Sequence, residues 1–339
     1  ALAADDPAYA PRIGIAADPV RRTLTVTDNG DGLTESEIVD YLATIGRSFT
    51  RETREQLALM APDDAARLLG QFGFGFLSAY LLASEVEVVS RSASGAPPVR
   101  WVSAGDESYT LGPGERDEVG TTIRLTVKPE ASFLLQGAAL SDCVSRFASL
   151  LPLPIHVGDD PVPVNPGHAP WDAADPDAAI RAFLLSHFDV RDPLAILPLG
   201  DTRVATLGGD GVVVPLRGFL YIPPASVASL REYGDLRVYL RGMFLRDGEK
   251  HLLPPWARFV RGVVDCPILQ PTASREDLHR DATFEQVQAA IEEQLGSGLQ
   301  RIAREEPATW RRIVEGHADV VTGWAVRDDA FFDRVADLV

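Results

Sequence analysis

The stretch TLTVTDNGDGLTESEIVDYL, residues 23–42, carries the strongest local signals in this chain of 339 residues. Apolar and polar residues alternate over residues 23–27, which predicts a strand with one buried face. The DNGDG run at residues 28–32 has the composition of a turn. Thr34 and Glu37 then stand at the spacing of a capping box, so we expect a helix to begin there. The apolar face of that helix is expected to carry Ile38, Leu42 and Ile45.

The neighbouring segments extend this unit into a sheet covered by helices. Alternation over residues 12–17 predicts a strand that pairs with residues 23–27 through a tight turn. The glycine-rich turn at residues 70–76 runs into a predicted helix over residues 77–82, and further strands are expected at residues 85–90, 99–103 and 121–127. The pattern predicts an α+β fold in which helices stack on one face of a mixed sheet.

Composition limits the function classes. The formal net charge of −17 disfavours a nucleic-acid partner, because phosphate backbones are anionic too. The longest apolar runs are far shorter than the ~18 residues that a membrane span needs. Cys143 and Cys266 lie far apart and are expected to be buried structural thiols in a reducing, cytoplasmic compartment. The six histidines show no metal-ligand spacing, so no metal site is expected within the chain.

Three glycine turns share an order that single turns do not have. Asp28-x-Gly30-x-Gly32 follows a strand, Gly70-x-x-Gly73-x-Gly75 leads into a helix, and Gly120-Thr121 opens a strand. Each turn alone is more often structural than functional. Their order resembles the nucleotide site of the GHKL ATPases, which include gyrase B, the MutL repair proteins, sensor histidine kinases and the heat-shock protein 90 chaperones. The resemblance implies a Bergerat sandwich that binds ATP or ADP with Mg²⁺.

The residue types suit the roles that the resemblance implies. The carboxylate of Asp28 can accept a hydrogen bond from the adenine amino group. Gly73 and Gly75 free backbone N–H groups at a helix N-terminus, where phosphate is favoured. Thr121 can bond through a water, and apolar side chains can line the purine slot. The implied nucleotide-binding residues are Asp28, Gly32, Leu33, Leu42, Gly70, Gln71, Phe72, Gly73, Phe74, Gly75, Phe76 and Thr121.

The second half narrows the resemblance to one family. Residues 258–265 (RFVRGVVD) with 274–276 (SRE) resemble the catalytic-loop region of the heat-shock protein 90 middle domain, and residues 217–223 and 236–244 match it too. The chain is therefore similar to bacterial HtpG-type members of that family over nearly its whole length. Strands are predicted at residues 212–222, 236–245 and 259–264, and helices at residues 175–186, 284–304, 308–316 and 329–338.

The expected domain organisation follows from the resemblance and from composition. Residues 1–156 are expected to form the ATP-binding domain without its first helix, and the Pro- and Asp-rich residues 157–173 a linker. Residues 174–339 are expected to form the middle domain, α/β to about residue 282 and helical from 283 onward. The resemblance also implies a C-terminal dimerisation domain outside this chain, through which the natural protein forms a homodimer.

Arg275 is the residue of the second half to which the resemblance assigns a catalytic role. The matching arginine of the family contacts the ATP γ-phosphate, a task that suits a permanently charged, forked guanidinium. The other reading is that Arg275 only pairs with a nearby carboxylate. The family's general-base glutamate and Mg²⁺-holding asparagine lie on a helix before the first strand, so both are expected to be missing from this chain. We therefore expect impaired hydrolysis by the chain as given.

The resulting hypothesis is an ATP-dependent chaperone that assists protein folding. Its partners are expected to be unfolded or partly folded client proteins, with weak ATP hydrolysis coupled to closure of a lid over residues 44–69. An alternative is a nucleotide-gated interaction module without useful hydrolysis. A MutL-like repair ATPase is disfavoured, because the chain is acidic and its only lysines are Lys128 and Lys250.

Overall fold

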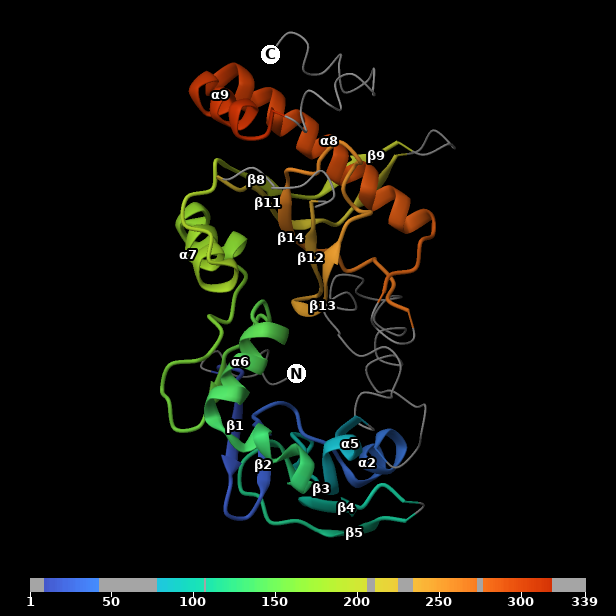
Figure 1. Ribbon diagram of the computed structural model, residues 1–339. Coiled ribbons are helices and arrows are strands. Elements are labelled where there is room, and N and C mark those ends of the chain that lie inside the picture. The colour runs from blue at the N-terminus through green and yellow to red at the C-terminus, as the bar shows by residue number, and fades with distance from the viewer. Residues whose placement is uncertain are drawn as a thin grey trace. The chain divides into compact units, whose positions relative to one another are not determined.

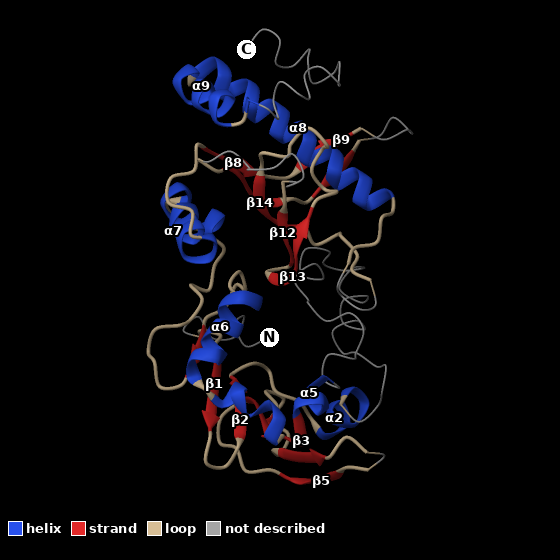
Figure 2. Ribbon diagram, viewed as in Figure 1, coloured by secondary structure: helices blue, strands red, loops and turns tan. Residues whose placement is uncertain are grey.

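The computed structural model divides the chain into two units, Ala1–His168 and Ala169–Val339, which are described separately (Figures 1 and 2). The residues that the structure describes are 9–42, 78–106, 108–205, 211–224, 234–272 and 277–318.

Among its described residues, the first unit forms a seven-stranded sheet in the order β5-β4-β3-β6-β2-β1-β7. Neighbouring strands are antiparallel except β1 and β7, which are parallel. The strands are β1 Ile13–Asp18, β2 Thr23–Asp28, β3 Ala83–Arg91, β4 Val99–Ser103, β5 Thr110–Pro113, β6 Gly120–Val127 and β7 Ile155–Val157. The predicted α+β class with a mixed sheet is confirmed.

The stretch at residues 23–42 folds as its sequence predicts. β1 and β2 form a hairpin in which Ile13 pairs with Asp28 and Asp18 pairs with Thr23. α2 spans Glu35–Tyr41, and Thr34 caps it: the Thr34 Oγ1 accepts from the Glu37 N–H, and the Glu37 carboxylate accepts from the Thr34 N–H. These two bonds satisfy N–H groups that a helix start leaves without partners.

The helices that the structure describes in the first unit cover one face of the sheet. These are α2, α5 Ala79–Leu82, the 3₁₀ helix η2 Pro129–Leu135 and α6 Gly137–Phe147. Ile38 of α2 is fully buried against Val86 and Val88 of β3, and Leu140 and Val144 of α6 pack on β1 and β7. The opposite face is polar: Glu87 pairs there with Arg100 and Arg124. We refer to it as the open face.

The Pro-rich stretch after β7 is attached to the first unit. The Asn165 side chain, 1% exposed, donates to the carbonyls of Leu151 (3.2 Å) and Leu153 (2.9 Å) and accepts from the Ile155 N–H (2.8 Å). Composition predicts a linker from residue 157, whereas Asn165 ties this part of it down. The domain limits given above stay predictions.

In the described part of the second unit, five strands form a sheet in the order β13-β12-β14-β11-β8, with β9 and β10 as a separate hairpin. β12 and β14 are parallel, so this sheet is mixed as well. The described helices and strands of the second unit are η3 Pro170–Asp172, α7 Pro176–Phe188, β8 Ala195–Leu199, β9 Thr202–Val204, β10 Val212–Val214, β11 Arg217–Ile222, β12 Leu236–Leu240, β13 Met243–Glu249, β14 Arg261–Asp265, α8 Ala282–Glu305 and α9 Pro307–Gly316.

The second sheet is buried on both faces, which explains the nearly continuous apolar run in β11. Phe219 meets Phe183 of α7 edge to face at 6.2 Å between ring centroids. Leu220 and Ile222 point to the other face, into a core shared with α8. Figure 1 shows α8 crossing this sheet, and a Cβ on Gly298 of α8 would lie only 2.8 Å from a Leu197 methyl carbon.

Two predicted strands are each split in the structure. The strand predicted at residues 236–245 turns at Arg241 and Gly242, whose φ angles are +53° and +79°. The Asp265 carboxylate accepts both of their N–H groups, at 2.6 and 2.7 Å, and thereby holds a β12–β13 hairpin. The strand predicted at residues 212–222 is interrupted at Pro215, which has no N–H for a ladder.

Other predictions have mixed outcomes. α7, α8 and α9 confirm the helices predicted at residues 175–186, 284–304 and 308–316, whereas residues 329–338 lie outside the described residues. Cys266 is buried, and burial raises the pKa of its thiol to about 12. Cys143 is exposed, so its predicted burial is wrong. Over the described residues, no helix combines the length and apolarity needed to cross a membrane.

Candidate nucleotide site

Asp28 ends β2, and its carboxylate links two strands that are adjacent in the sheet. Its Oδ1 accepts from the Gly30 N–H at 2.8 Å and from the Thr121 N–H of β6 at 3.3 Å. Alternation along β2 places Asp28 on the face of Leu24, which packs beneath the helices. Within the described part of the chain both bonds go to Oδ1, so Oδ2 remains available to accept from a ligand.

Ser90 of β3 connects this carboxylate to the start of α2. Its side chain is fully buried, and its Oγ lies 2.9 Å from the Oγ1 of Thr121 and accepts from the Leu33 N–H at 2.7 Å. The Ser90 Oγ also lies 3.3 Å from the Gly120 carbonyl, to which it can donate. When Ser90 donates there, Thr121 donates to Ser90 and keeps lone pairs for a ligand or a water.

Gly32 and Gly120 allow these strand ends to converge. Gly32 has φ +64°, and a Cβ there would lie 2.0 Å from the Arg91 carbonyl oxygen. Gly120 has φ +128°, and its Cβ would lie 2.3 Å from the Asp28 carbonyl oxygen. Both positions therefore require glycine for close backbone packing. The predicted contact of Gly32 with a nucleotide stays a prediction.

The turn after Asp28 is also held from the open face and from the segment before β1. Arg116, in the β5–β6 connection, donates from Nη2 to the Asp28 carbonyl at 2.9 Å. Asn29 accepts from the Arg12 N–H at 2.8 Å and donates to the Ala10 carbonyl at 2.8 Å. The Tyr9 hydroxyl donates to the Asn29 carbonyl at 2.8 Å. Consecutive carbonyls of the turn are thus each fixed by a donor.

The predicted apolar lining is present in part. Leu33 and Leu42 both pack against the cluster centred on Ile38, Val86 and Val88, next to the Ser90 network. The structure therefore brings together Asp28 and Thr121, with Gly32, Leu33 and Leu42 on the adjoining elements. The predicted residues Gly70, Gln71, Phe72, Gly73, Phe74, Gly75, Phe76 and Arg275 lie outside the described residues.

Sequence reasoning overlooked Ser90 and Arg116. A signal for Ser90 exists: in β3 the buried face runs Val86, Val88 and then Ser90, so a hydroxyl occupies an apolar position. A polar residue at such a position needs partners, which marks it for attention. Arg116 has no comparable signal, because its bond to Asp28 spans 88 residues of sequence.

Each unit has a cavity that is lined by described residues. In the first unit, a cavity of about 270 Å³ is lined by Asp28 and Asn29 of the turn together with Gly14, Thr27, Arg116 and His156. Among the described residues, no group of three or more His, Cys, Asp or Glu side chains is placed to hold a metal ion.

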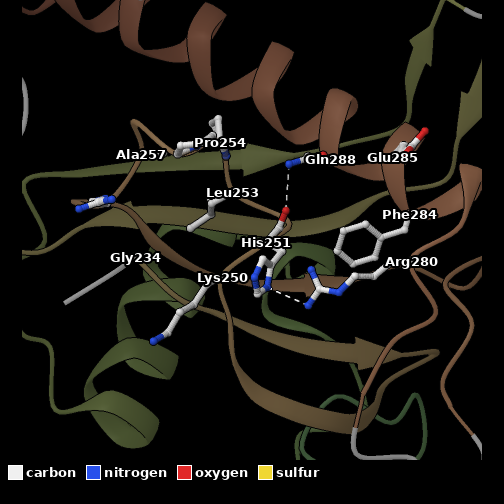
Figure 3. Close-up of a pocket in the computed structure, with 12 residues that line it drawn as sticks. Gly234, Lys250, His251, Leu253, Pro254, Ala257, Arg280, Phe284, Glu285 and Gln288 are labelled. Carbon is white, nitrogen blue, oxygen red and sulfur yellow. Dashed lines mark hydrogen bonds between the residues drawn. The ribbon is translucent and has the colours of Figure 1, made fainter. Parts of the chain in front are cut away.

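The other cavity, of about 600 Å³, belongs to the second unit, between residues 250–258 and the start of α8 (Figure 3). Arg280 donates to the His251 Nδ1 at 2.8 Å and lies over the Phe284 ring at 5.3 Å. Gln288 donates to the His251 carbonyl at 3.0 Å. The lining is basic and partly apolar, and none of the predicted site residues that the structure describes belongs to it.

Comparison with known proteins gives two family matches. A family described as "Histidine kinase-, DNA gyrase B-, and HSP90-like ATPase" matches residues 7–103, and one described as "Hsp90 protein" matches residues 207–336. The first match includes Asp28, Ser90 and the turn between β2 and α2. The second covers most of the second unit, including β11, β14 and α8.

Curated relatives match along nearly the whole chain. "Chaperone protein HtpG" of Methylobacterium nodulans is 32% identical over 311 residues, which are 88% of this chain and 50% of the relative. The protein of the same name from Chromobacterium violaceum is 30% identical over 346 residues, 97% of this chain and 54% of the relative. That of Halorhodospira halophila is 30% identical over 360 residues, 99% and 55%. The chain spans about half the length of these relatives.

Proposed function

This chain belongs to the heat-shock protein 90 family, with a GHKL-type ATPase region followed by the family's middle region, and on that premise we propose that it binds ATP at Asp28. The single observation that carries the proposal is how the two oxygens of the Asp28 carboxylate are hydrogen-bonded. Its Oδ1 is committed to two backbone N–H groups, while Oδ2 stays on the helix-covered face of the sheet. An adenine amino group is a donor that such an oxygen accepts.

The proposed base contacts extend to neighbouring residues. Thr121, hydrogen-bonded to Ser90, bonds the purine ring directly or through a water, and Leu33 and Leu42 bound its apolar side. Gly32 lets the chain before α2 lie against the end of β3, beside these residues. This arrangement selects a purine that carries a donor at its amino position.

The phosphates are proposed to lie on the glycine-rich turn that the sequence predicts at residues 70–76, because free backbone N–H groups at the start of a helix favour anions. Mg²⁺ would enter with the nucleotide. The family resemblance places the Mg²⁺-holding asparagine and the general base on a helix that precedes the strands, and we propose those roles for that helix. Bound nucleotide supplies the phosphoanhydride that is cleaved, and Arg275 is proposed to neutralise charge on the γ-phosphate.

At the level of the whole protein, we propose an ATP-dependent chaperone that binds unfolded or partly folded clients and works as a homodimer in the cytoplasm. Nucleotide binding would be coupled to closure of the segment around residues 44–69. The match of the second unit to the heat-shock protein 90 middle region, together with the acidic composition, disfavours a DNA-repair ATPase.

Isothermal titration of the chain with ADP tests the adenine assignment. Asp28→Asn replaces an acceptor with an amide that presents N–H groups to the adenine amine, so we expect about a 10-fold or greater loss of affinity. Asp31→Asn makes the same change of charge at an exposed position of the same turn and is expected to stay within about twofold of wild type. Equal affinities for wild type and Asp28→Asn would refute the assignment.

A separate experiment tests hydrolysis. Steady-state phosphate release by the natural full-length protein should fall by about 10³-fold or more in Arg275→Ala, because a γ-phosphate arginine contributes on that scale. Phosphate release at background level in the unsubstituted protein would instead support the nucleotide-gated interaction module.

A further inference from the structure

Arg116 contacts the turn at residues 28–32 from the open face of the sheet, opposite to the proposed adenine pocket. Its guanidinium reaches three acceptors on three parts of the chain: Nη2 donates to the Asp28 carbonyl at 2.9 Å, Nε to the Glu118 carbonyl at 2.9 Å, and Nη1 to the Thr122 hydroxyl. The end of β2, the loop before β6 and β6 itself are therefore joined by a single side chain.

Gly120 provides the space in which this guanidinium lies. A Cβ at Gly120 would stand 2.8 Å from the Arg116 Nη2 and 2.3 Å from the Asp28 carbonyl oxygen. The absent side chain thus serves two purposes, since it admits both the β2 backbone and the Arg116 fork. Arg91 adds a further constraint by donating from Nη1 to the Arg116 carbonyl at 3.2 Å.

The side chain and the main-chain carbonyl of Asp28 are therefore fixed by different partners. The carboxylate Oδ1 is held by the N–H groups of Gly30 and Thr121, and the main-chain carbonyl is held by Arg116. The direction of Oδ2 depends on both, because rotation of the residue 28 peptide would carry the side chain away from Thr121. If either the carboxylate or the main-chain carbonyl of Asp28 loses its hydrogen bonds, Oδ2 can move out of line with the donor of a ligand, and that hydrogen bond weakens.

We propose that Arg116 is a positioning residue for base selection: it holds the Asp28 peptide from the open face so that Oδ2 points at the donor of the bound purine. The proposal rests on the proposed ATP-binding function and goes beyond it by assigning selectivity to a residue that does not touch the nucleotide. Lysine cannot replace Arg116, because one ammonium group cannot reach three separate acceptors with the geometry of a planar fork.

The test compares ADP with inosine diphosphate, which carries a carbonyl in place of the adenine amino group. Affinities of the full chain are measured by isothermal titration for wild type, Arg116→Met, Arg116→Lys and Arg124→Met. We expect Arg116→Met to bind ADP about 5- to 10-fold more weakly and inosine diphosphate within about twofold of wild type, the size expected for one charge-assisted hydrogen bond. Arg116→Lys is expected to behave like Arg116→Met.

Arg124→Met is the matched control. Arg124 lies on the same open face and pairs with Glu87, not with the turn. The Arg124→Met variant should therefore prefer ADP over inosine diphosphate as strongly as wild type does. Thr122→Val provides a milder variant should Arg116→Met fold poorly: it removes one acceptor of the guanidinium and should shift the ADP preference in the same direction, by about two- to threefold.

The outcomes separate this proposal from the proposed function. If Arg116→Met weakens both nucleotides by the same factor, or if its ADP preference equals that of wild type while Asp28→Asn loses the preference, the positioning role is overturned and the ATP site stands. If the unsubstituted chain binds neither nucleotide, or Asp28→Asn keeps the preference, the proposed function fails and the Arg116 role is overturned with it.

Discussion

The hydroxyls of Ser90 and Thr121 lie 2.9 Å apart at the adjacent ends of β3 and β6, and both side chains are buried. This pair joins two parts of the proposed site. On one side the Ser90 oxygen accepts from the Leu33 N–H, just before α2, and on the other the Thr121 N–H donates to Asp28. A buried hydroxyl pair of this kind stabilises a structure only when its partners are satisfied.

Removing the Ser90 hydroxyl should therefore cost stability. In Ser90→Ala the Leu33 N–H loses its acceptor, and we expect the free energy of unfolding to fall by about 1–3 kcal/mol. Ser84→Ala on the same strand removes an exposed hydroxyl bonded to the Thr126 carbonyl and should change it by less than about 0.5 kcal/mol. Urea denaturation of the two variants measures both values, and equal losses would contradict the role given to Ser90.

Gly120→Ala should be destabilising for steric as well as conformational reasons. Its φ of +128° strains any residue with a Cβ, and that atom would also meet the Asp28 carbonyl oxygen at 2.3 Å. Gly95 has φ +83° but nothing within 4 Å of its added Cβ, so Gly95→Ala isolates the strain, which is about 1 kcal/mol. We expect Gly120→Ala to lose at least about 2 kcal/mol more than Gly95→Ala in chemical denaturation.

If Gly120→Ala loses more stability than Gly95→Ala, we also expect Gly120→Ala to bind ADP more weakly than wild type. The reason is that the added Cβ can be accommodated only if the Asp28 peptide moves. Similar stabilities of the two alanine variants would show that the strand ends can separate without cost.

His317 should make the second unit sensitive to mild acid. Its ring is buried against Phe259, and its Nε2 lies 3.1 Å from the Pro223 carbonyl, to which it donates. Nδ1 has no partner within the described part of the chain, so a second proton would be buried without an acceptor. Burial accordingly lowers the pKa of His317 from 6.5.

The direction of the pH effect follows from linkage. The unfolded chain binds the proton more readily, so the His317 contribution is fully present above about pH 6.5 and is lost as the pH falls below it toward the lower folded pKa. His317→Gln keeps a donor for the Pro223 carbonyl but does not titrate. Its free energy of unfolding should fall less steeply than that of wild type below pH 6.5. Urea denaturation of both proteins at a series of pH values measures the two slopes, and equal slopes would contradict the role given to His317.

Glu249 should stabilise the basic cavity of the second unit. Its carboxylate is 1% exposed, accepts from the His251 N–H at 2.8 Å and lies 3.3 Å from the Arg246 Nη1. Glu249→Gln keeps the shape but removes the charge, and because Arg246 is partly exposed we expect a loss of about 1–2 kcal/mol.

Asp247→Asn is the comparison for Glu249→Gln, because Asp247 on the same strand pairs with Arg237 at a far more exposed position. We expect Asp247→Asn to lower the free energy of unfolding by at most about 0.5–1 kcal/mol. Thermal unfolding at matched pH ranks the two variants, and a larger loss for Asp247→Asn would reverse the assignment.

How far the sequence predicts the fold differs between local and long-range features. The capping box of α2 and the caps of α7 and α8 are local, so Thr34, Asp175 and Asp281 could each be identified from a few neighbouring residues. The β12–β13 hairpin could not, because Asp265 stabilises it from another strand. A run of apolar residues interrupted by Arg241 and Gly242 otherwise has the pattern of one continuous strand.

The sequence by itself determined the strand, turn and helix of residues 23–42, since alternation and capping depend on neighbours within four residues. It also determined family membership, through motifs spread along both halves. Only the tertiary structure decided how Asp28 is held. The Thr121 N–H, the Ser90 hydroxyl and the Arg116 guanidinium reach the turn across 93, 57 and 88 residues of chain, respectively. Such contacts depend on which strands pair, in which register, and no local pattern encodes that geometry.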